Sequence, residues 1–230
     1  MSAQKRSGWF YVLVSCGVLF LAAVVAIGAV VFMALRWTKN FASEMEDPQL
    51  RTAKAIEAMN METLPEGYHV AMSLNAPFGF GNLVMLTDGE QGEDAHDIDT
   101  GDHFLLYIEG PGWDRDWKEF VRGGDPPFDS LSELNINIDG TQRVGQGELT
   151  VGRMEVFYSA GLGDVSAEGF HRDEGVFSIL LVRCPQGDKR SRAIVWSGPP
   201  ADEGPEDRTH GTTADPARIA EMLGNFRLCG

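Results

Sequence analysis

The nine residues from Val176 to Cys184 read VFSILLVRC. Successive side chains of a strand point to opposite faces of a sheet, and here both alternating sets of positions are apolar. This pattern is typical of a strand that is buried on both faces. Pro185 to Lys189 separates it from a second apolar run, Ala193 to Trp196, so the two runs are predicted to pair as a hairpin.

Further strands are expected before this hairpin, separated by glycine and proline. They are Tyr68–Leu74, Leu83–Thr87, His103–Glu109, Gly147–Val151 and Arg153–Ser159. The run HFLLYIE at His103–Glu109 is nearly continuous in apolar residues, which favours a central place in the sheet.

Three other stretches predict turns or loops. Leu134 to Ile138 alternates polar and apolar residues and meets Asp139-Gly140, the strongest short signal for a hairpin turn. Gly161 to Glu174 is rich in glycine and acidic residues, which predicts a loop. A polar, proline-rich loop is expected from Ser197 to Thr213.

Helices are expected at Asp47-Pro48 and Asp215-Pro216, because Asp caps free N–H groups and proline lacks the N–H that the first turn leaves unpaired. The first start is followed by Leu50, Ala53, Ile56 and Met59, and the second by Ile219, Met222, Leu223 and Phe226. The first helix is either a stalk or docked on the domain, and its apolar stripe favours docking.

A third helix is indicated by four apolar residues that share one helical face: Trp113, Trp117, Phe120 and Val121. Two interpretations are open, a ligand groove built on the two tryptophans and a helix that covers the sheet. Core packing is the favoured one.

Near the amino terminus, the 27 residues from Trp9 to Leu35 contain no formal charge. As a helix this stretch is about 40 Å long, which exceeds the roughly 30 Å hydrocarbon core of a bilayer. Trp9 and Trp37 stand near its ends, at the depths that aromatic rings prefer. We therefore predict a single transmembrane helix and association with the membrane through Trp9–Leu35.

Three alternatives to this anchor are less favoured. One is a buried helix of a soluble protein, which the length of the stretch and its aromatic ends make improbable. A cleaved signal peptide has a shorter apolar region and a small-residue cleavage site. Leu13 to Cys16 resembles a lipoprotein processing site, but the sequence after Cys16 stays apolar instead of turning polar. The expected organisation is a cytoplasmic leader at residues 1–8, the helix at 9–35, a connector at 36–63 and an extracytoplasmic domain at 64–230.

Composition adds a location and excludes one class of partner. Arginine outnumbers lysine 14 to 5, a bias that hints at a GC-rich bacterial genome. With the anchor, the expected location is the bacterial inner membrane, and the short leader and the cysteines favour a periplasmic or extracellular domain. All 34 acidic residues follow Lys39, so the rest of the chain carries a net charge of −19. Nucleic acid is an improbable partner for such a surface, because phosphate contacts need clustered Lys and Arg.

Once Cys16 is assigned to the membrane, Cys184 and Cys229 remain in a domain expected to face an oxidising compartment. We predict a disulfide between them. Two separately buried thiols are the alternative.

The sequence shows no recognised catalytic motif, so an enzyme is not predicted, and no cofactor is implied. The densest chemical feature is the acidic loop Asp88–Asp102, which holds seven carboxylates and one histidine. Oxygen ligands of this kind bind calcium, and the candidates are Asp94, Asp97, Asp99 and Asp102. A solvated surface loop is the favoured interpretation, because the spacing matches no known cage.

Several segments together resemble the PsbP-like and DcrB-like domains: LPEGY at Leu64–Tyr68, the hairpin FSILLVRC and RAIVWSG, and the closing IAEMLGNFRL at Ile219–Leu228. The resemblance covers roughly residues 64 to 228. It implies an α/β/α sandwich and a non-enzymatic role in binding or assembly at a membrane.

The sequence therefore predicts an α+β domain with a mainly antiparallel sheet and flanking helices behind one transmembrane helix. The expected function is a binding or envelope-assembly module, with an envelope protein as partner. A calcium-responsive module that uses the acidic loop 88–102 is the second hypothesis, and a hydrolase without a recognised motif is the third.

Overall fold

The computed structural model describes residues 47–76, 81–89, 101–111, 117, 119–120, 122, 124–125, 131–132, 136–167, 170–185, 190–201 and 209–229. They belong to one compact unit, Glu44–Gly230. Within this described part, every helix is too short or too polar to span a bilayer. The predicted anchor, Trp9–Leu35, lies outside the described residues.

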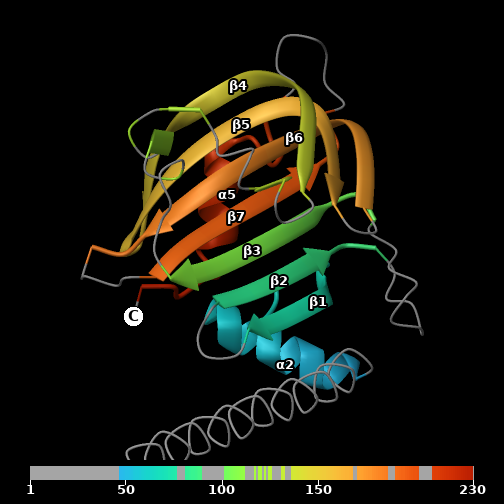
Figure 1. Ribbon diagram of the computed structural model, residues 1–230, viewed down its shortest axis with the longest axis vertical. Helices are drawn as coiled ribbons and strands as arrows, with labels where there is room; N and C mark the ends of the chain where they lie inside the picture. The colour runs from blue at the N-terminus through green and yellow to red at the C-terminus, as the bar shows by residue number, and fades with distance from the viewer. Residues whose placement is uncertain are drawn as a thin grey trace, which may run out of the picture. The chain divides into compact units, whose positions relative to one another are not determined.

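Seven described strands form one sheet in which all neighbouring strands are antiparallel (Figure 1). In chain order they are β1 (His69–Ala76), β2 (Gly81–Thr87), β3 (Phe104–Pro111), β4 (Asn137–Val151), β5 (Met154–Ala167), β6 (Phe170–Arg183) and β7 (Arg190–Gly198). In space the order is β1-β2-β3-β7-β6-β5-β4. The long strands β4, β5 and β6 arch over, which curves the sheet into a half-barrel (Figure 1). The predicted α+β class is confirmed.

The predicted central hairpin is also confirmed. Val176 to Val182 of β6 pairs with β7, and this segment is buried on both faces of the sheet. Ile179 and Leu181 belong to one core cluster, whereas Leu180 and Val182 belong to the other. Two separate cores therefore sit on the two faces.

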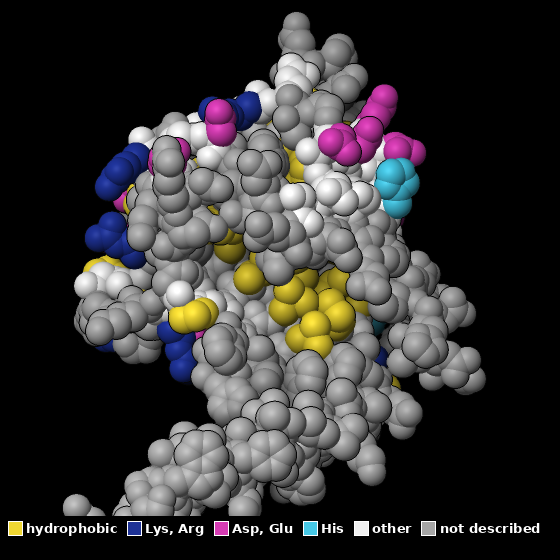
Figure 2. All heavy atoms as spheres, viewed as in Figure 1, with side chains coloured by type: hydrophobic (Ala, Val, Ile, Leu, Met, Phe, Trp, Pro, Cys, Tyr) yellow, Lys and Arg dark blue, Asp and Glu magenta, His cyan; other side chains and the backbone are white. Residues whose placement is uncertain are grey.

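On one face, the sheet packs against described residues of the crossover between β3, in the middle of the sheet, and β4, at its far edge. The described residues of the crossover include four that pack into the core of this face: Trp117, Phe120, Leu131 and Ile136. The rings of Trp117 and Phe120 meet edge to face with centroids 6.5 Å apart. The predicted core role of these two is confirmed, and Trp113 and Val121 lie outside the described residues. On the face shown in Figure 2, apolar side chains gather centrally and charged ones lie around the periphery.

The other face carries the two described helices, α2 (Pro48–Met59) and α5 (Pro216–Leu223). Both begin as predicted. Asp47 Oδ1 accepts from the N–H groups of Gln49 and Leu50 at 2.9 and 3.2 Å. Asp215 Oδ1 accepts from the N–H of Ala217 at 2.8 Å. The predicted apolar residues of the second helix, Ile219, Met222, Leu223 and Phe226, are all buried.

Helix α2 docks on the sheet, which decides between the two alternatives for this segment. Its buried side consists of Arg51, Ala55 and Met59, at an exact four-residue spacing. The predicted stripe was mostly wrong: Leu50 is 40% exposed, Ala53 is exposed and Ile56 is partly buried, so Met59 alone of its four residues is buried. Ala55, fully buried, has a small side chain that allows the helix to approach the sheet closely.

Two sequence predictions fail in the long strands. Asp139-Gly140 makes no hairpin turn, because β4 continues through it and carries a register shift between Asp139 and Gln142. The turn lies at Gly152, whose φ of +60° suits glycine. The predicted loop Gly161–Glu174 is instead mostly strand, in β5 and β6.

The glycines of these strands make room for aromatic rings. Gly161 pairs with Phe177, and a Cβ on Gly161 would lie 2.7 Å from that ring. Gly147 pairs with Tyr158 in the same way, with a Cβ contact of 3.0 Å. A strand that uses glycine under a neighbouring ring looks like a loop in the sequence.

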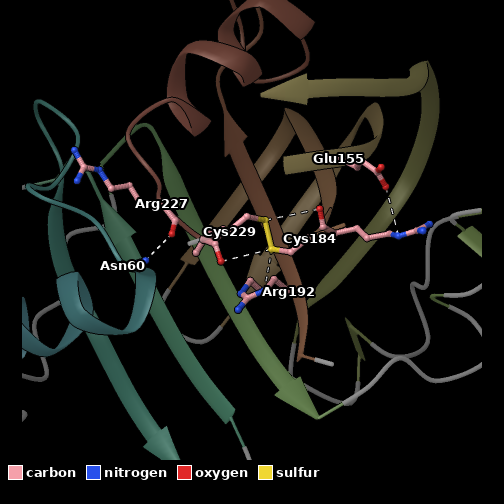
Figure 3. Close-up of a disulfide and its surroundings, with 8 residues drawn as sticks. Asn60, Glu155, Cys184, Arg192, Arg227 and Cys229 are labelled. Atoms are coloured by element: carbon pink, nitrogen blue, oxygen red, sulfur yellow. Dashed lines mark hydrogen bonds and ion pairs between the residues drawn. A yellow bond between two sulfur atoms is a disulfide. The ribbon is translucent and has the colours of Figure 1, made fainter. Parts of the chain in front are cut away.

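The predicted disulfide is confirmed. Cys184, which follows β6, and Cys229, which follows α5, are bonded with their Cα atoms 5.3 Å apart (Figure 3).

Candidate functional site

A groove of about 590 Å³ lies beside α5 on the helical face of the sheet. It is lined by three separate parts of the chain: the segment before β1, the end of β7, and α5 together with Asn225, two residues after the helix ends. The lining residues are Thr63, Leu64, Pro65, Glu66, Tyr68, Trp196, Arg218, Glu221, Met222 and Asn225. This volume falls within the usual range of small-molecule and peptide-side-chain sites, about 300–1,000 Å³.

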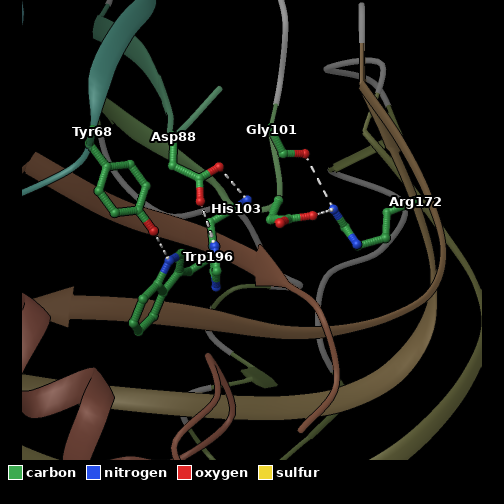
Figure 4. A network of polar contacts seen from close by, with 7 residues as sticks. Tyr68, Asp88, Gly101, His103, Arg172 and Trp196 are labelled. Atoms are coloured by element: carbon green, nitrogen blue, oxygen red, sulfur yellow. Dashed lines mark hydrogen bonds and ion pairs between the residues drawn. The ribbon is translucent and has the colours of Figure 1, made fainter. Parts of the chain in front are cut away.

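Two aromatic side chains fix the floor of the groove. The indole Nε1–H of Trp196 donates a hydrogen bond to Tyr68 Oη at 2.9 Å (Figure 4). Burial raises the pKa of Tyr68 to about 12, with smaller effects from the hydrogen bond to Trp196 and the charges of Asp88 and Arg218. The phenol therefore stays protonated at neutral pH. Because its oxygen accepts from Trp196, its hydrogen is available to an acceptor on a ligand.

The rim of the groove is polar and exposed. Arg218 donates to Glu221 at 2.6 Å across one turn of α5, and both side chains are more than half exposed. Glu66, in the segment before β1, also lines the groove and is exposed. The rim therefore carries two carboxylates and one guanidinium around an apolar, aromatic floor.

A histidine–carboxylate pair lies near this floor (Figure 4). Asp88 Oδ1 accepts from the backbone N–H of His103, and Asp88 Oδ2 accepts from His103 Nδ1, both at 2.7 Å. Burial alone would raise the pKa of Asp88, but these hydrogen bonds outweigh it and the pKa is lowered. His103 is held with Nδ1 toward the carboxylate, so Nε2 is the ring nitrogen left for other contacts.

The His103 ring packs against Gly198, where an added Cβ would lie 2.4 Å from the ring. No serine, threonine or cysteine hydroxyl or thiol among the described residues bonds to it.

Of the four calcium candidates, only Asp102 is described, and Asp94, Asp97 and Asp99 lie outside the described residues. Arg172 Nη2 donates to Asp102 Oδ1 at 3.1 Å and to the carbonyl of Gly101 at 3.3 Å (Figure 4). The two described carboxylates of the loop, Asp88 and Asp102, thus both have protein partners. The described residues contain no cluster of three or more potential metal ligands.

Sequence reasoning missed the groove because its parts are far apart in the chain. LPEGY, the closing strand and the last helix are each predicted from local patterns, but those patterns do not show that the three segments lie side by side. The Asp88–His103 pair had a usable signal: antiparallel β2 and β3 pair Thr87 with Phe104, which brings the next residues outward, Asp88 and His103, together.

No protein-family model matches the chain, and a search of curated proteins finds no match either.

Proposed function

We propose that this protein is a single-pass, membrane-anchored binding module that holds a segment of an envelope protein in the groove between Thr63–Tyr68 and α5. Trp9–Leu35 is the anchor, in a bacterial inner membrane, and the acidic domain stands on the periplasmic or extracellular side. The Cys184–Cys229 bond supports this location, because disulfides persist in oxidising compartments.

The observation that carries the proposal is the fixed Tyr68–Trp196 floor under an exposed polar rim. Binding sites typically combine an apolar floor with a few placed polar groups. Here the floor offers one hydrogen-bond donor, the Tyr68 hydroxyl, which suits a backbone carbonyl of an extended peptide. The rim carboxylates Glu66 and Glu221 lie in a domain with excess negative charge, which favours a segment with a basic side chain.

The resemblance to PsbP-like and DcrB-like domains, with the α/β/α sandwich that it implies, remains part of the proposal. An antiparallel sheet carries α2 and α5 on one face and the helical residues Trp117 and Phe120 on the other. We propose a role in binding or assembly at a membrane, and such a role requires no catalytic residue.

Site-specific photo-crosslinking in intact cells tests the proposal. A photoreactive amino acid replaces Glu66 or Asn225 at the rim, and Gln146 or Asp173 as exposed controls outside the groove. We expect one defined envelope protein to be cross-linked from both rim positions and from neither control. Equal cross-linking from all four positions, or none from the rim, would refute the groove as the binding site.

A second variant tests the chemistry of the floor. Tyr68→Phe removes the hydroxyl and keeps the ring, so we expect the cross-linking yield to fall about three- to tenfold, the effect of one lost hydrogen bond. Tyr158→Phe, outside the groove, is the matched control and should leave the yield unchanged.

A further inference from the structure

The segment Phe226–Cys229, here called the latch segment, joins parts of the domain that are distant in sequence. Phe226 pairs with Met61 in an isolated β-bridge. Arg227 N–H donates to the carbonyl of Asn60 at 3.0 Å, and Asn60 Nδ2 donates to the carbonyl of Arg227 at 2.5 Å (Figure 3). Cys229 is bonded to Cys184 at the end of β6.

These contacts tie together the two walls of the groove. One wall begins with Thr63, two residues after the Met61 bridge, and the other ends with Asn225, next to Phe226. The latch segment also buries two apolar side chains, Phe226 and Leu228. Besides the backbone that continues from α5, the disulfide is a second covalent connection, which joins the latch segment to the end of β6. Without this bond the segment is held on that side by noncovalent contacts alone.

The surroundings of the disulfide favour exchange at one of its two sulfurs. Arg192 Nη1 donates to Cys184 Sγ at 3.4 Å (Figure 3). A guanidinium in this position stabilises a thiolate on Cys184, which makes Cys184 the better leaving group. An attacking thiolate therefore reacts at Cys229 Sγ, which is half-buried and so within reach of a reagent.

We propose that the Cys184–Cys229 disulfide is a redox switch of the groove, which a dithiol reductant opens. One thiolate of the dithiol attacks Cys229 Sγ, the sulfur–sulfur bond breaks, and Cys184 leaves as a thiolate beside Arg192. The second thiol then displaces Cys229 from the mixed disulfide. The dithiol is oxidised to a disulfide as both cysteines are reduced, and the freed latch segment lets the walls separate. The role of this switch in binding rests on the function proposed above.

Hydrogen–deuterium exchange of the full-length protein in nanodiscs tests the switch without any partner. With dithiothreitol as the dithiol, we expect amide exchange in residues 60–68 and 219–228 to accelerate about tenfold or more, and exchange in β5 and the buried part of β6 to stay unchanged. Reoxidation should restore the protection. Unchanged exchange at the groove walls, or acceleration over the whole sheet, would overturn the proposal.

Variants separate the switch from simple loss of stability. The Cys184→Ala/Cys229→Ala protein should show the exchange pattern of the reduced wild type. Arg192→Gln should slow reduction by dithiothreitol several-fold, Arg192→Lys should restore the rate, and Arg183→Gln, which changes the neighbour of Cys184, should not slow it. If Arg192→Gln is reduced at the wild-type rate, the assigned leaving group is wrong. Because exchange needs no partner, failure of the proposed binding function would leave this result intact.

Discussion

At the scale of single residues, Glu109 on β3 is the one buried carboxylate among the residues that the structure describes. Tyr107 Oη donates to Glu109 Oε2 at 2.8 Å, and Arg190 Nη1 donates to Oε1 at 2.5 Å. Burial alone would raise the pKa of Glu109, but the hydrogen bonds from Arg190 and Tyr107 and the charge of Arg192 outweigh it, so the pKa is lowered. A buried carboxylate of this kind makes stability depend on pH.

The stabilising contribution of Glu109 should therefore be lost when the solution is acidified. Its folded pKa lies below the ordinary value of 4.5, so its contribution is complete above about pH 4.5 and is lost as the pH falls through the folded pKa. Glu109→Gln cannot titrate, so we expect a shallower fall of the unfolding free energy below pH 4.5. At pH 7 the variant should lose about 1.5–3 kcal/mol, the range for hydrogen bonds to a charged group.

The measurement is urea unfolding of the purified protein between pH 3 and pH 7. Glu155→Gln is the control, because Glu155 pairs with Arg183 at 3.4 Å near the surface, where ion pairs contribute about 0–1 kcal/mol. Equal pH dependence in wild type and Glu109→Gln would contradict the assignment.

At the scale of elements, the curved part of the sheet depends on glycines that lie under aromatic rings. The ring of Phe177 is 2% exposed and occupies the space over Gly161. Gly145, in the adjacent strand, differs: a Cβ there would meet Tyr158 at 3.8 Å, an ordinary van der Waals contact. The same substitution, glycine to alanine, can therefore be compared at a crowded position, Gly161, and at an uncrowded one, Gly145.

Gly161→Ala should destabilise the domain by about 1–3 kcal/mol, the cost of overpacking a core that cannot relax. Gly145→Ala should be neutral or slightly stabilising, because alanine restricts the unfolded chain more than glycine does. Thermal unfolding of the two variants beside wild type measures the difference. In the double variant Gly161→Ala/Phe177→Leu, the smaller leucine leaves room for the added methyl group. Part of the lost stability should therefore be recovered, and no recovery would mean that the strain lies in the backbone.

The same glycines explain which elements the sequence could predict. Capped helices and the β6–β7 hairpin carry local signals: Asp before Pro, and an unbroken apolar run. Gly161 and Asp139-Gly140 carry the signals of loops and turns, yet their roles depend on the strand alongside. A single sequence does not show which residue lies opposite on the neighbouring strand. A glycine in a bulge, or one under an aromatic ring, therefore looks the same in the sequence as a glycine in a turn.

At the scale of the whole molecule, the site was less predictable than the sheet. The groove joins Tyr68, Trp196 and Arg218, which lie in three segments that meet only through the strand order β1-β2-β3-β7 and the docking of α5. That order includes a crossover, and local patterns do not determine crossovers. The disulfide was predictable because eliminating Cys16 left a single pair.

If the proposed membrane anchor is right, the state of the disulfide also reports on which side of the membrane the domain folds. If Trp9–Leu35 is an uncleaved anchor with its amino terminus in the cytoplasm, the mature protein keeps that terminus and external protease reaches residues 64–230. We expect non-reducing electrophoresis of thiol-blocked cells to show Cys184 and Cys229 joined in the wild type. A mature protein that begins after residue 16 or after residue 29 would contradict the anchor.

Reversing the flanking charges tests orientation, because positive residues favour the cytoplasmic side of a membrane helix. Lys5→Glu/Arg6→Glu leaves Arg36 and Lys39 as the basic flank, so a fraction of the chains should insert with the domain in the cytoplasm. In that reducing compartment Cys184 and Cys229 should stay as thiols. Arg36→Glu/Lys39→Glu is the matched control, which strengthens the original bias and should keep the bond complete. If the bond forms equally in both variants, the leader does not set the orientation.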